Sequence, residues 1–136
     1  MNKKNLIIIL VVVILAIVVF FPVRYLVNVR KYKKMVSEIV ISDVDLSKIQ
    51  DGVYGGSCDV IFIAADVSVS VEKNKIKDIK LIRHKNERGQ RAEEIVNRVL
   101  NSQSLKVDTI SGATNSSKVI LKAIENALTT APENNA

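Results

Sequence analysis

The chain has 136 residues and a formal net charge of +6, and it contains one cysteine. This length allows one domain, and a hydrophobic content of 48% with 25% charged residues excludes a disordered polar segment. A single cysteine excludes an internal disulfide and a thiolate metal cluster, so Cys58 is expected to be a small buried hydrophobic residue.

The positive charge is concentrated at the N-terminus. Residues 1–35 contain seven lysines and arginines and no acidic residue, whereas residues 36–136 contain 13 basic and 14 acidic residues. The second part of the chain is therefore close to neutral. This distribution argues against a nucleic-acid partner.

Residues 1–29 predict an N-terminal transmembrane signal anchor. Leu6–Phe21 is a run of 16 apolar residues, and the first charge after it is Arg24. The Arg24 side chain can reach the membrane interface, so the span approaches the roughly 20 residues that a lipid bilayer requires. The run is longer than the apolar region of a cleaved secretory signal and no small-residue cleavage site follows it, which favours an uncleaved anchor. The five cations that follow the span predict a cytoplasmic domain by the positive-inside rule.

Residues 30–50 are expected to form a juxtamembrane connector, and residues 51–128 a folded domain. The first segment of this domain, residues 51–56, places three glycines around Tyr54. Such a pattern is typical of a strand with a bulge, or of a close approach between two backbones. Alternating valines in residues 67–71 predict a half-buried strand, and the apolar residues of 76–82 predict a second strand. Residues 73–75 supply the turn, so the two strands are expected to form a hairpin.

Two helices are predicted in the second half of the domain. Apolar residues between Ala92 and Leu100 recur at helical spacing, and so do those between Val119 and Leu128. Residues 129–136 are expected to be a polar C-terminal tail. The sequence thus predicts an α+β fold, in which a small antiparallel sheet packs with two helices after one transmembrane helix.

The segment 108–117, just before the last helix, is rich in small and hydroxyl residues. Gly112 and Ala113 leave the backbone uncovered, and Ser111, Thr114 and Ser116 supply hydroxyl groups. The unpaired N–H groups of a helix start lie at the positive end of the helix dipole, so the segment suits a phosphate. An ordinary helix N-cap is the alternative, because Ser, Thr and Asn are favoured there whatever the function.

The pattern Asp-x-x-Ser-Gly-Ala-Thr-x-Ser, from Asp108 to Ser116, resembles the flavinylation motif of the FMN-binding domain family. This family includes the C subunit of sodium-pumping NADH:quinone reductases and the G subunit of Rnf complexes. An Asp-Gly-x-Tyr-x-Gly stretch from Asp51 and a His-x-x-Glu-x-Gly stretch from His84 extend the resemblance over residues 51–128. The chain lacks the insertions of the large respiratory subunits, so the resemblance does not extend to membership of a sodium pump.

The resemblance implies that a separate flavin transferase joins FMN through its phosphate to Thr114. Asp108 would be recognised by that transferase or would hold the loop through bonds to backbone N–H groups. Gly112 and Ala113 would admit the phosphate and the ribityl chain. The expected cofactor-binding residues are Thr114, Asp108, Ser111, Gly112, Ala113, Ser116, Tyr54 and His84.

Tyr54 and His84 are in this set as candidates for contact with the flavin ring. Each has an equally plain structural alternative: Tyr54 as a packed strand aromatic, and His84 as a solvent-facing turn residue. No nucleophile–base pair, metal cluster or nucleotide-binding loop is evident in the sequence, so no catalytic residue and no metal site are predicted.

The resemblance implies a membrane-anchored extracytoplasmic flavoprotein, an electron carrier more than a stand-alone enzyme. It would relay electrons between a membrane donor, a quinone or another flavoprotein, and an outer acceptor. Covalent flavins of this type are loaded by an extracytoplasmic transferase, so the resemblance favours the outer face of the membrane over the side that the positive-inside rule predicts. The alternatives are a reductase that binds FMN non-covalently and an unflavinylated surface interaction module.

Overall fold

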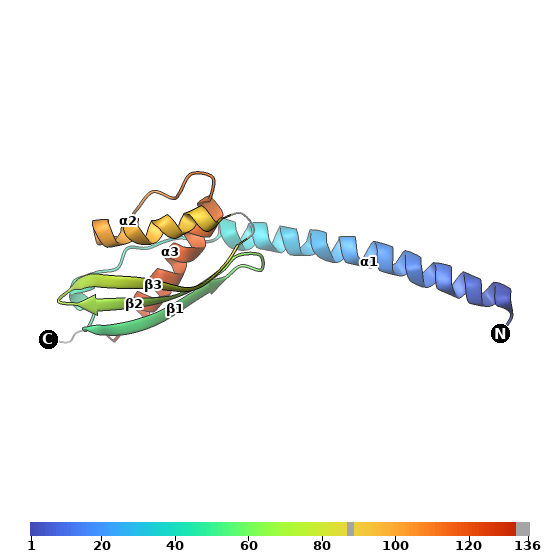
Figure 1. The fold of residues 1–136 in the computed structure, drawn as a ribbon, viewed down its shortest axis with the longest axis horizontal. Coiled ribbons are helices and arrows are strands. Elements are labelled where there is room, and N and C mark those ends of the chain that lie inside the picture. Colours follow the sequence, from blue (N-terminus) through green and yellow to red (C-terminus); the bar gives the residue numbers. More distant parts are fainter. Residues whose placement is uncertain (87–88, 133–136) are drawn as a thin grey trace. The chain divides into compact units, whose positions relative to one another are not determined.

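A computed structural model of the protein describes residues 1–86 and 89–132. The chain divides into two compact units, Met1–Lys34 and Met35–Ala136. The elements in chain order are shown in Figure 1.

The first unit consists of most of helix α1 (Lys3–Ser37), which is long and apolar enough to cross a membrane. At 1.5 Å per residue its 35 residues extend over about 52 Å, more than the roughly 30 Å of a bilayer's hydrocarbon core. Its large apolar side chains from Leu6 to Phe21 are all exposed within the chain. This composition is what a lipid-facing helix requires, and it agrees with the predicted anchor.

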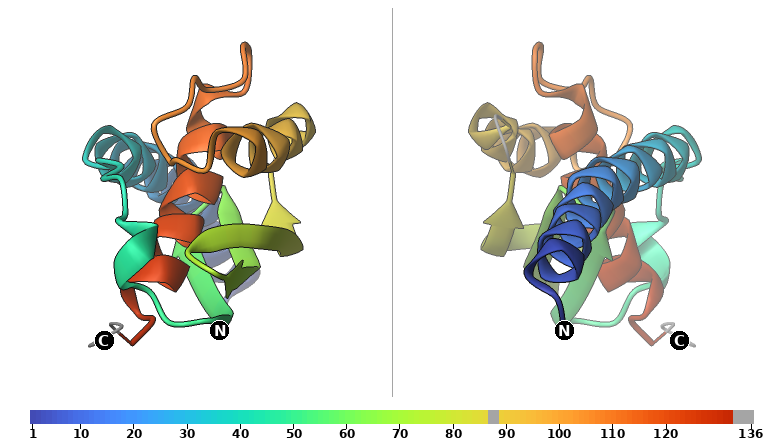
Figure 2. Two further views of the ribbon diagram at one scale, coloured as in Figure 1. Left: turned by 90° about the vertical axis from the view of Figure 1, so that its left-hand side faces the viewer. Right: turned by 90° about the vertical axis from the view of Figure 1, so that its right-hand side faces the viewer.

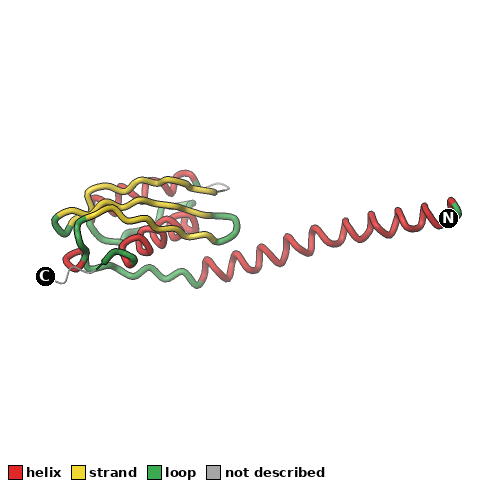
Figure 3. The backbone as a smooth tube through the Cα atoms, turned by 90° about the horizontal axis from the view of Figure 1, so that it is seen from below, coloured by secondary structure: helices red, strands yellow, loops and turns green. Residues whose placement is uncertain are grey.

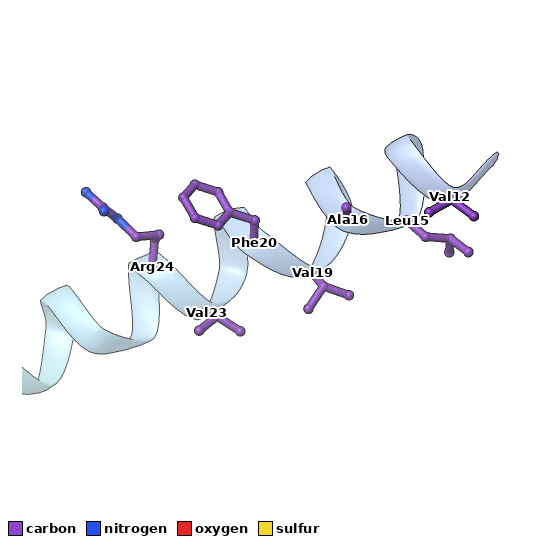
Figure 4. A pocket seen from close by; sticks show the side chains of 7 residues that line it. All are labelled: Val12, Leu15, Ala16, Val19, Phe20, Val23 and Arg24. Atoms are coloured by element: carbon purple, nitrogen blue, oxygen red, sulfur yellow. The ribbon is translucent and has the colours of Figure 1, made fainter. Parts of the chain in front are cut away.

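One side of α1 has a shallow apolar hollow (Figure 4). The guanidinium carbon of Arg24 lies 5.8 Å from the centre of the Phe20 ring, within the range of a cation–π interaction. All the lining residues belong to α1, and Arg24 is the one charged residue among them, so the surface suits acyl chains better than a phosphorylated cofactor. They are Val12, Leu15, Ala16, Val19, Phe20, Val23 and Arg24.

The second unit contains a three-stranded antiparallel sheet in the order β1-β2-β3. The strands are β1 (Gly52–Asp59), β2 (Ala64–Glu72) and β3 (Lys75–Lys85). The predicted hairpin is confirmed: Lys73 and Asn74 form its two-residue loop with φ of 51° and 63°. Positive φ at both positions is the geometry of a type I′ turn, whose twist matches that of paired strands.

Both predicted helices of the domain are present, on the same face of the sheet (Figure 2). A short 3₁₀ helix, η2 (Gln90–Glu94), leads into α2 (Ile95–Ser102), and α3 (Thr114–Thr129) follows. All the apolar residues of α3 predicted from helical spacing are buried, which forms the core between α3 and the sheet. Seen from below, the strands lie in front of the helices, so the other face of the sheet is turned toward the viewer (Figure 3).

Gly56 explains the glycine-rich start of the domain. A Cβ atom added at Gly56 would lie 2.8 Å from the Cα of Ala127 and would also overlap the carbonyl oxygen of Ala123. Glycine therefore lets α3 approach the backbone of β1, as the close-approach interpretation of this segment predicts.

The segment between α1 and β1 packs onto the domain. Val36 and Ile49 are buried, and the short 3₁₀ helix η1 (Leu46–Lys48) lies between these two residues in the chain. The Asp43 carboxylate accepts hydrogen bonds from the Ser104 hydroxyl at 2.7 Å and from the Leu105 N–H at 3.0 Å. The compact unit therefore begins at Met35, so most of the segment expected as a connector belongs to it.

Candidate functional site

The α2–α3 loop, residues 103–113, projects from the domain on the side away from the sheet, where it is drawn in orange (Figures 1 and 2). Near its end, the Ala113 N–H donates a hydrogen bond of 2.9 Å to the Ile110 carbonyl. Gly112 has φ of +77°, as the third position of a type II turn requires. An added Cβ at Gly112 would have no atom within 4 Å, so this glycine is needed for its backbone conformation and not for space.

Ser117 fastens the loop to the first turn of α3. Its side chain is fully buried, and its Oγ accepts a hydrogen bond of 3.0 Å from the Ile110 N–H. The same hydroxyl donates a bond of 2.8 Å to the Ala113 carbonyl. The turn that contains Gly112 is therefore held at both of its ends by one buried hydroxyl.

Arg98, on α2, fastens the other side of the loop. Its Nη1 donates to the carbonyl oxygens of Asp108 at 2.9 Å and of Thr109 at 3.4 Å. The Asp108 carboxylate is exposed, and it makes no hydrogen bond within residues 1–86 and 89–132. The backbone carbonyl of Asp108 thus helps to hold the loop, and the side-chain carboxylate of the same residue is available to a binding partner.

Thr114 is exposed and is the first residue of α3. The N-cap position is Ala113, which has no side chain that can accept a hydrogen bond from the helix start. The structure therefore does not show an ordinary helix cap made by a Ser, Thr or Asn side chain at this position, which was the alternative drawn from the sequence. The positive end of α3 is left without a capping side chain, beside an exposed hydroxyl.

The remaining residues of the motif differ in their exposure. Ser111 and Gly112 are exposed at the turn, whereas Ala113 is buried. Ser116 is 3% exposed and packs against Gly89, where an added Cβ would lie 2.6 Å from the Cβ of Ser116. Ser116 therefore packs the start of α3 against Gly89, and its hydroxyl is not on the surface.

A β-bulge in β3 determines where His84 points. Val67 pairs with Leu81 and Asp66 pairs with Arg83, which leaves Ile82 as an extra residue in β3. The extra residue reverses the alternation of side chains, so Arg83 reaches Asp66 with a 2.6 Å hydrogen bond and the following residue turns toward the helices. The side chain of His84 is 2% exposed, which excludes the solvent-facing alternative.

One nitrogen of the His84 ring has partners and the other does not. Nδ1 lies 3.2 Å from a carboxylate oxygen of Glu93 and 3.4 Å from the Asn86 side-chain nitrogen. Nε2 is buried and, in the part of the chain that the structure describes, has no hydrogen-bond partner. A buried polar atom without a partner and an uncapped helix terminus are features that a phosphorylated heteroaromatic ligand can satisfy. The residues present therefore fit FMN.

The structure does not bring Tyr54 to this site. The Tyr54 hydroxyl donates a 2.7 Å hydrogen bond to the Gln50 carbonyl, and the Gln50 N–H donates to the Pro132 carbonyl at 3.4 Å, just beyond the end of α3. Thr114 lies at the other end of this 16-residue helix, about 24 Å away at 1.5 Å per residue. His84 lies on the strand that leads to Gly89, which contacts the first turn of α3.

Sequence reasoning missed Arg98 and the groove beside it. The groove, of about 710 Å³, runs between the end of α2 and the α2–α3 loop. In the sequence Arg98 is one charged residue on the polar side of an amphipathic helix, so nothing in the helical pattern distinguishes it from a solvated charge. The groove is lined by Arg98, Asn101, Ser102, Lys106, Val107 and Asp108.

Cys58 is half-buried, and burial raises the pKa of its thiol above the ordinary value. This environment disfavours the reactive thiolate. Among the described residues, no group of three His, Cys, Asp or Glu side chains is placed to hold a metal ion.

Comparison with known proteins finds a family match in the second half of the chain. The family model described as FMN-binding domain matches residues 63–129. The matched segment includes β2, β3, both helices of the domain, and the α2–α3 loop with Thr114. A search among curated proteins found no match. Residues 63–129 therefore match the FMN-binding domain family, and together with an N-terminal helix long and apolar enough to cross a membrane the match supports a membrane-anchored FMN-binding protein.

Proposed function

We propose that this protein is an electron carrier that holds FMN covalently, as a phosphoester on Thr114, at the outer face of the membrane. The observation that carries the proposal is the position of Thr114: an exposed hydroxyl at the uncapped start of α3, next to a loop fastened on both sides. The phosphate would lie against backbone N–H groups at the positive end of the helix.

Exposure separates Thr114 from the neighbouring hydroxyl residues. Ser116 and Ser117 are buried, and Ser117 is already engaged in two hydrogen bonds. Ser111 is exposed, but it precedes the helix and lies in the turn. Thr114 therefore best combines access for a separate enzyme with the electrostatic environment that a phosphate requires.

Attachment requires an activated donor, because condensation of a hydroxyl with free phosphate is unfavourable in water. We infer that the flavin transferase uses a flavin dinucleotide. The Oγ1 of Thr114 attacks the phosphorus on the flavin side and forms the new P–O bond. The bond from this phosphorus to the bridging oxygen of the pyrophosphate breaks, and a nucleoside monophosphate leaves. The proton of the hydroxyl passes to a base on the transferase, and no electrons are exchanged in this step.

When bound, FMN supplies one- and two-electron transfer, and the protein tunes it through contacts and hydrogen bonds. His84, whose Nδ1 is held by Glu93 and whose Nε2 has no partner among the described residues, is the candidate of this chain for such a contact. A membrane donor, a quinone or another flavoprotein, would deliver electrons to the carrier, and an acceptor outside the membrane would receive them. Covalent attachment keeps the cofactor in a compartment where lost FMN cannot be replaced from a cellular pool.

The test is intact mass spectrometry of the full chain, co-expressed with a flavin transferase in a host that has a known acceptor domain. Wild type is expected to gain about 440 Da, the mass of FMN less water, and to show flavin fluorescence after denaturation. Thr114→Ala is expected to lose the adduct, and Thr129→Ala, a control at an exposed threonine at the far end of α3, to retain it. An unmodified wild type in cells that load the known acceptor would refute covalent attachment. Free flavin after denaturation would favour a reversible FMN site, and no flavin an interaction module.

A further inference from the structure

We propose that Arg98 is a positioning residue for flavin attachment, which holds the backbone of Asp108 and Thr109 so that the transferase meets a preformed loop. This inference rests on the proposed function, because it concerns the same Thr114 site. It extends that function to a residue of α2 that lies outside the flavinylation motif.

The first argument is the way the loop is held. Its end beside α3 is fastened by Ser117, which binds the backbone of Ile110 and Ala113. Asp108 precedes the residues that Ser117 binds and lies in a segment without regular secondary structure. Within the part of the chain that the structure describes, Arg98 alone contributes a side-chain hydrogen bond to the backbone of Asp108 or Thr109. Arg98 therefore determines where the Asp108 carboxylate lies relative to Thr114.

The second argument is that Arg98 leaves the recognition groups unoccupied. It binds the carbonyl of Asp108, while Asp108 itself is exposed and is one of the residues that line the groove. The hydroxyl of Thr114 is exposed as well. An enzyme that must contact both groups at once binds better when their separation is fixed before the encounter, because no ordering cost is then incurred on binding.

The chemistry of the side chain fits this role. A guanidinium group is a planar donor of fixed geometry, and one Nη of Arg98 reaches two successive carbonyl oxygens. A lysine ammonium at the same place carries the charge but lacks the planar, fixed arrangement of N–H donors. It is therefore expected to restrain the loop only in part. Arg98 is exposed on α2, so its replacement leaves the buried core unchanged.

The test compares initial rates of flavin loading of the full chain in detergent, with purified transferase and a flavin dinucleotide. Arg98→Ala is expected to lower kcat/KM about tenfold, mainly through KM, as the loss of charge-assisted hydrogen bonds predicts. Arg98→Lys is expected to recover part of the loss. Arg91→Ala, which removes an exposed cation from η2, is the matched control and is expected to load like wild type.

A double-mutant cycle separates positioning from general loss of structure. If Arg98 acts by placing Asp108, the pair Arg98→Ala with Asp108→Asn loads no more slowly than Asp108→Asn alone. Hydrogen exchange of unloaded chains supplies a second measurement: amides of residues 109–113 are expected to exchange faster in Arg98→Ala, with unchanged protection in α3. Wild-type rates in Arg98→Ala, multiplicative losses in the cycle, or unchanged exchange would each overturn the role of Arg98 and leave the proposed function intact. Failure of wild type to load would instead overturn both.

Discussion

The hydroxyl of Ser117 uses both of its hydrogen-bonding capacities in the interior of the domain. It accepts from the Ile110 N–H and donates to the Ala113 carbonyl. Ser117→Ala would leave a buried N–H without a partner, so we expect a loss of about 1–3 kcal/mol in the free energy of unfolding. The denaturant midpoint of the full chain in detergent, followed by tyrosine fluorescence, measures this loss.

Ser111→Ala is the matched control for that measurement. Ser111 is exposed in the same loop, so its substitution should change the free energy of unfolding by no more than about 0.5 kcal/mol. Equal losses in the two variants would contradict the structural role assigned to Ser117. They would indicate that the loop, and not the buried hydroxyl, determines the stability.

The contact between α3 and β1 allows a comparison of two adjacent glycines. An added methyl group at Gly56 meets the backbone of α3, whereas at Gly55 the nearest atom, the Val67 carbonyl oxygen, is 4.0 Å away. We expect Gly56→Ala to destabilise the domain by about 1–3 kcal/mol through overpacking, and Gly55→Ala to be tolerated. Thermal unfolding of the two variants beside wild type tests this, and an equal effect at both positions would contradict the packing described.

Helical and strand elements were predictable because their signals are local. The valines of β2 and the apolar face of α3 follow the periods of their structures over many residues. The bulge at Ile82 was not predictable, because it depends on how β3 pairs with β2 and not on the pattern of β3 alone. The burial of His84 depends on this bulge, which is why the sequence alone could not exclude the solvent-facing turn residue.

The candidate site, too, was predictable from the sequence only in part. The motif from Asp108 to Ser116 was visible as a pattern, and it led to the exposed Thr114. The sequence did not distinguish the exposed hydroxyls from the buried Ser116 and Ser117, because spacing along a helix gives no contact with Gly89 or Ile110. Tyr54 entered the candidate set through a sequence motif, and the fold places its hydroxyl near the opposite end of α3.

For the whole domain, the segment before β1 introduces a dependence of stability on pH. Burial opposes the charge of Asp43, but hydrogen bonds from Ser104 and from the N–H groups of Leu105 and Val44 outweigh it. Its pKa is held below the ordinary value of 3.8. A carboxyl group with a lowered pKa in the folded state stabilises the fold above its ordinary pKa. That contribution is lost as the pH falls through the folded pKa.

We therefore expect Asp43→Asn to lower the free energy of unfolding by about 1 kcal/mol near pH 7, a value reduced for the exposure of this group. Below about pH 4 the difference from wild type should shrink as the pH falls through the folded pKa, because the wild-type carboxyl becomes protonated. Denaturant titrations across this range measure the change. Asp108→Asn, which removes an exposed carboxylate without a partner in the described residues, is the control, and a difference that is independent of pH would contradict the assignment.

The packing of Gly89 against Ser116 joins two segments that are far apart in the sequence. A side chain at position 89 would occupy the space of the Ser116 Cβ, so the two positions cannot both carry a side chain without a shift of the backbone. Over evolutionary time they should change as a pair. Among homologues in which position 89 is no longer glycine, we expect position 116 to become glycine, or the start of α3 to shift and carry the flavin acceptor with it.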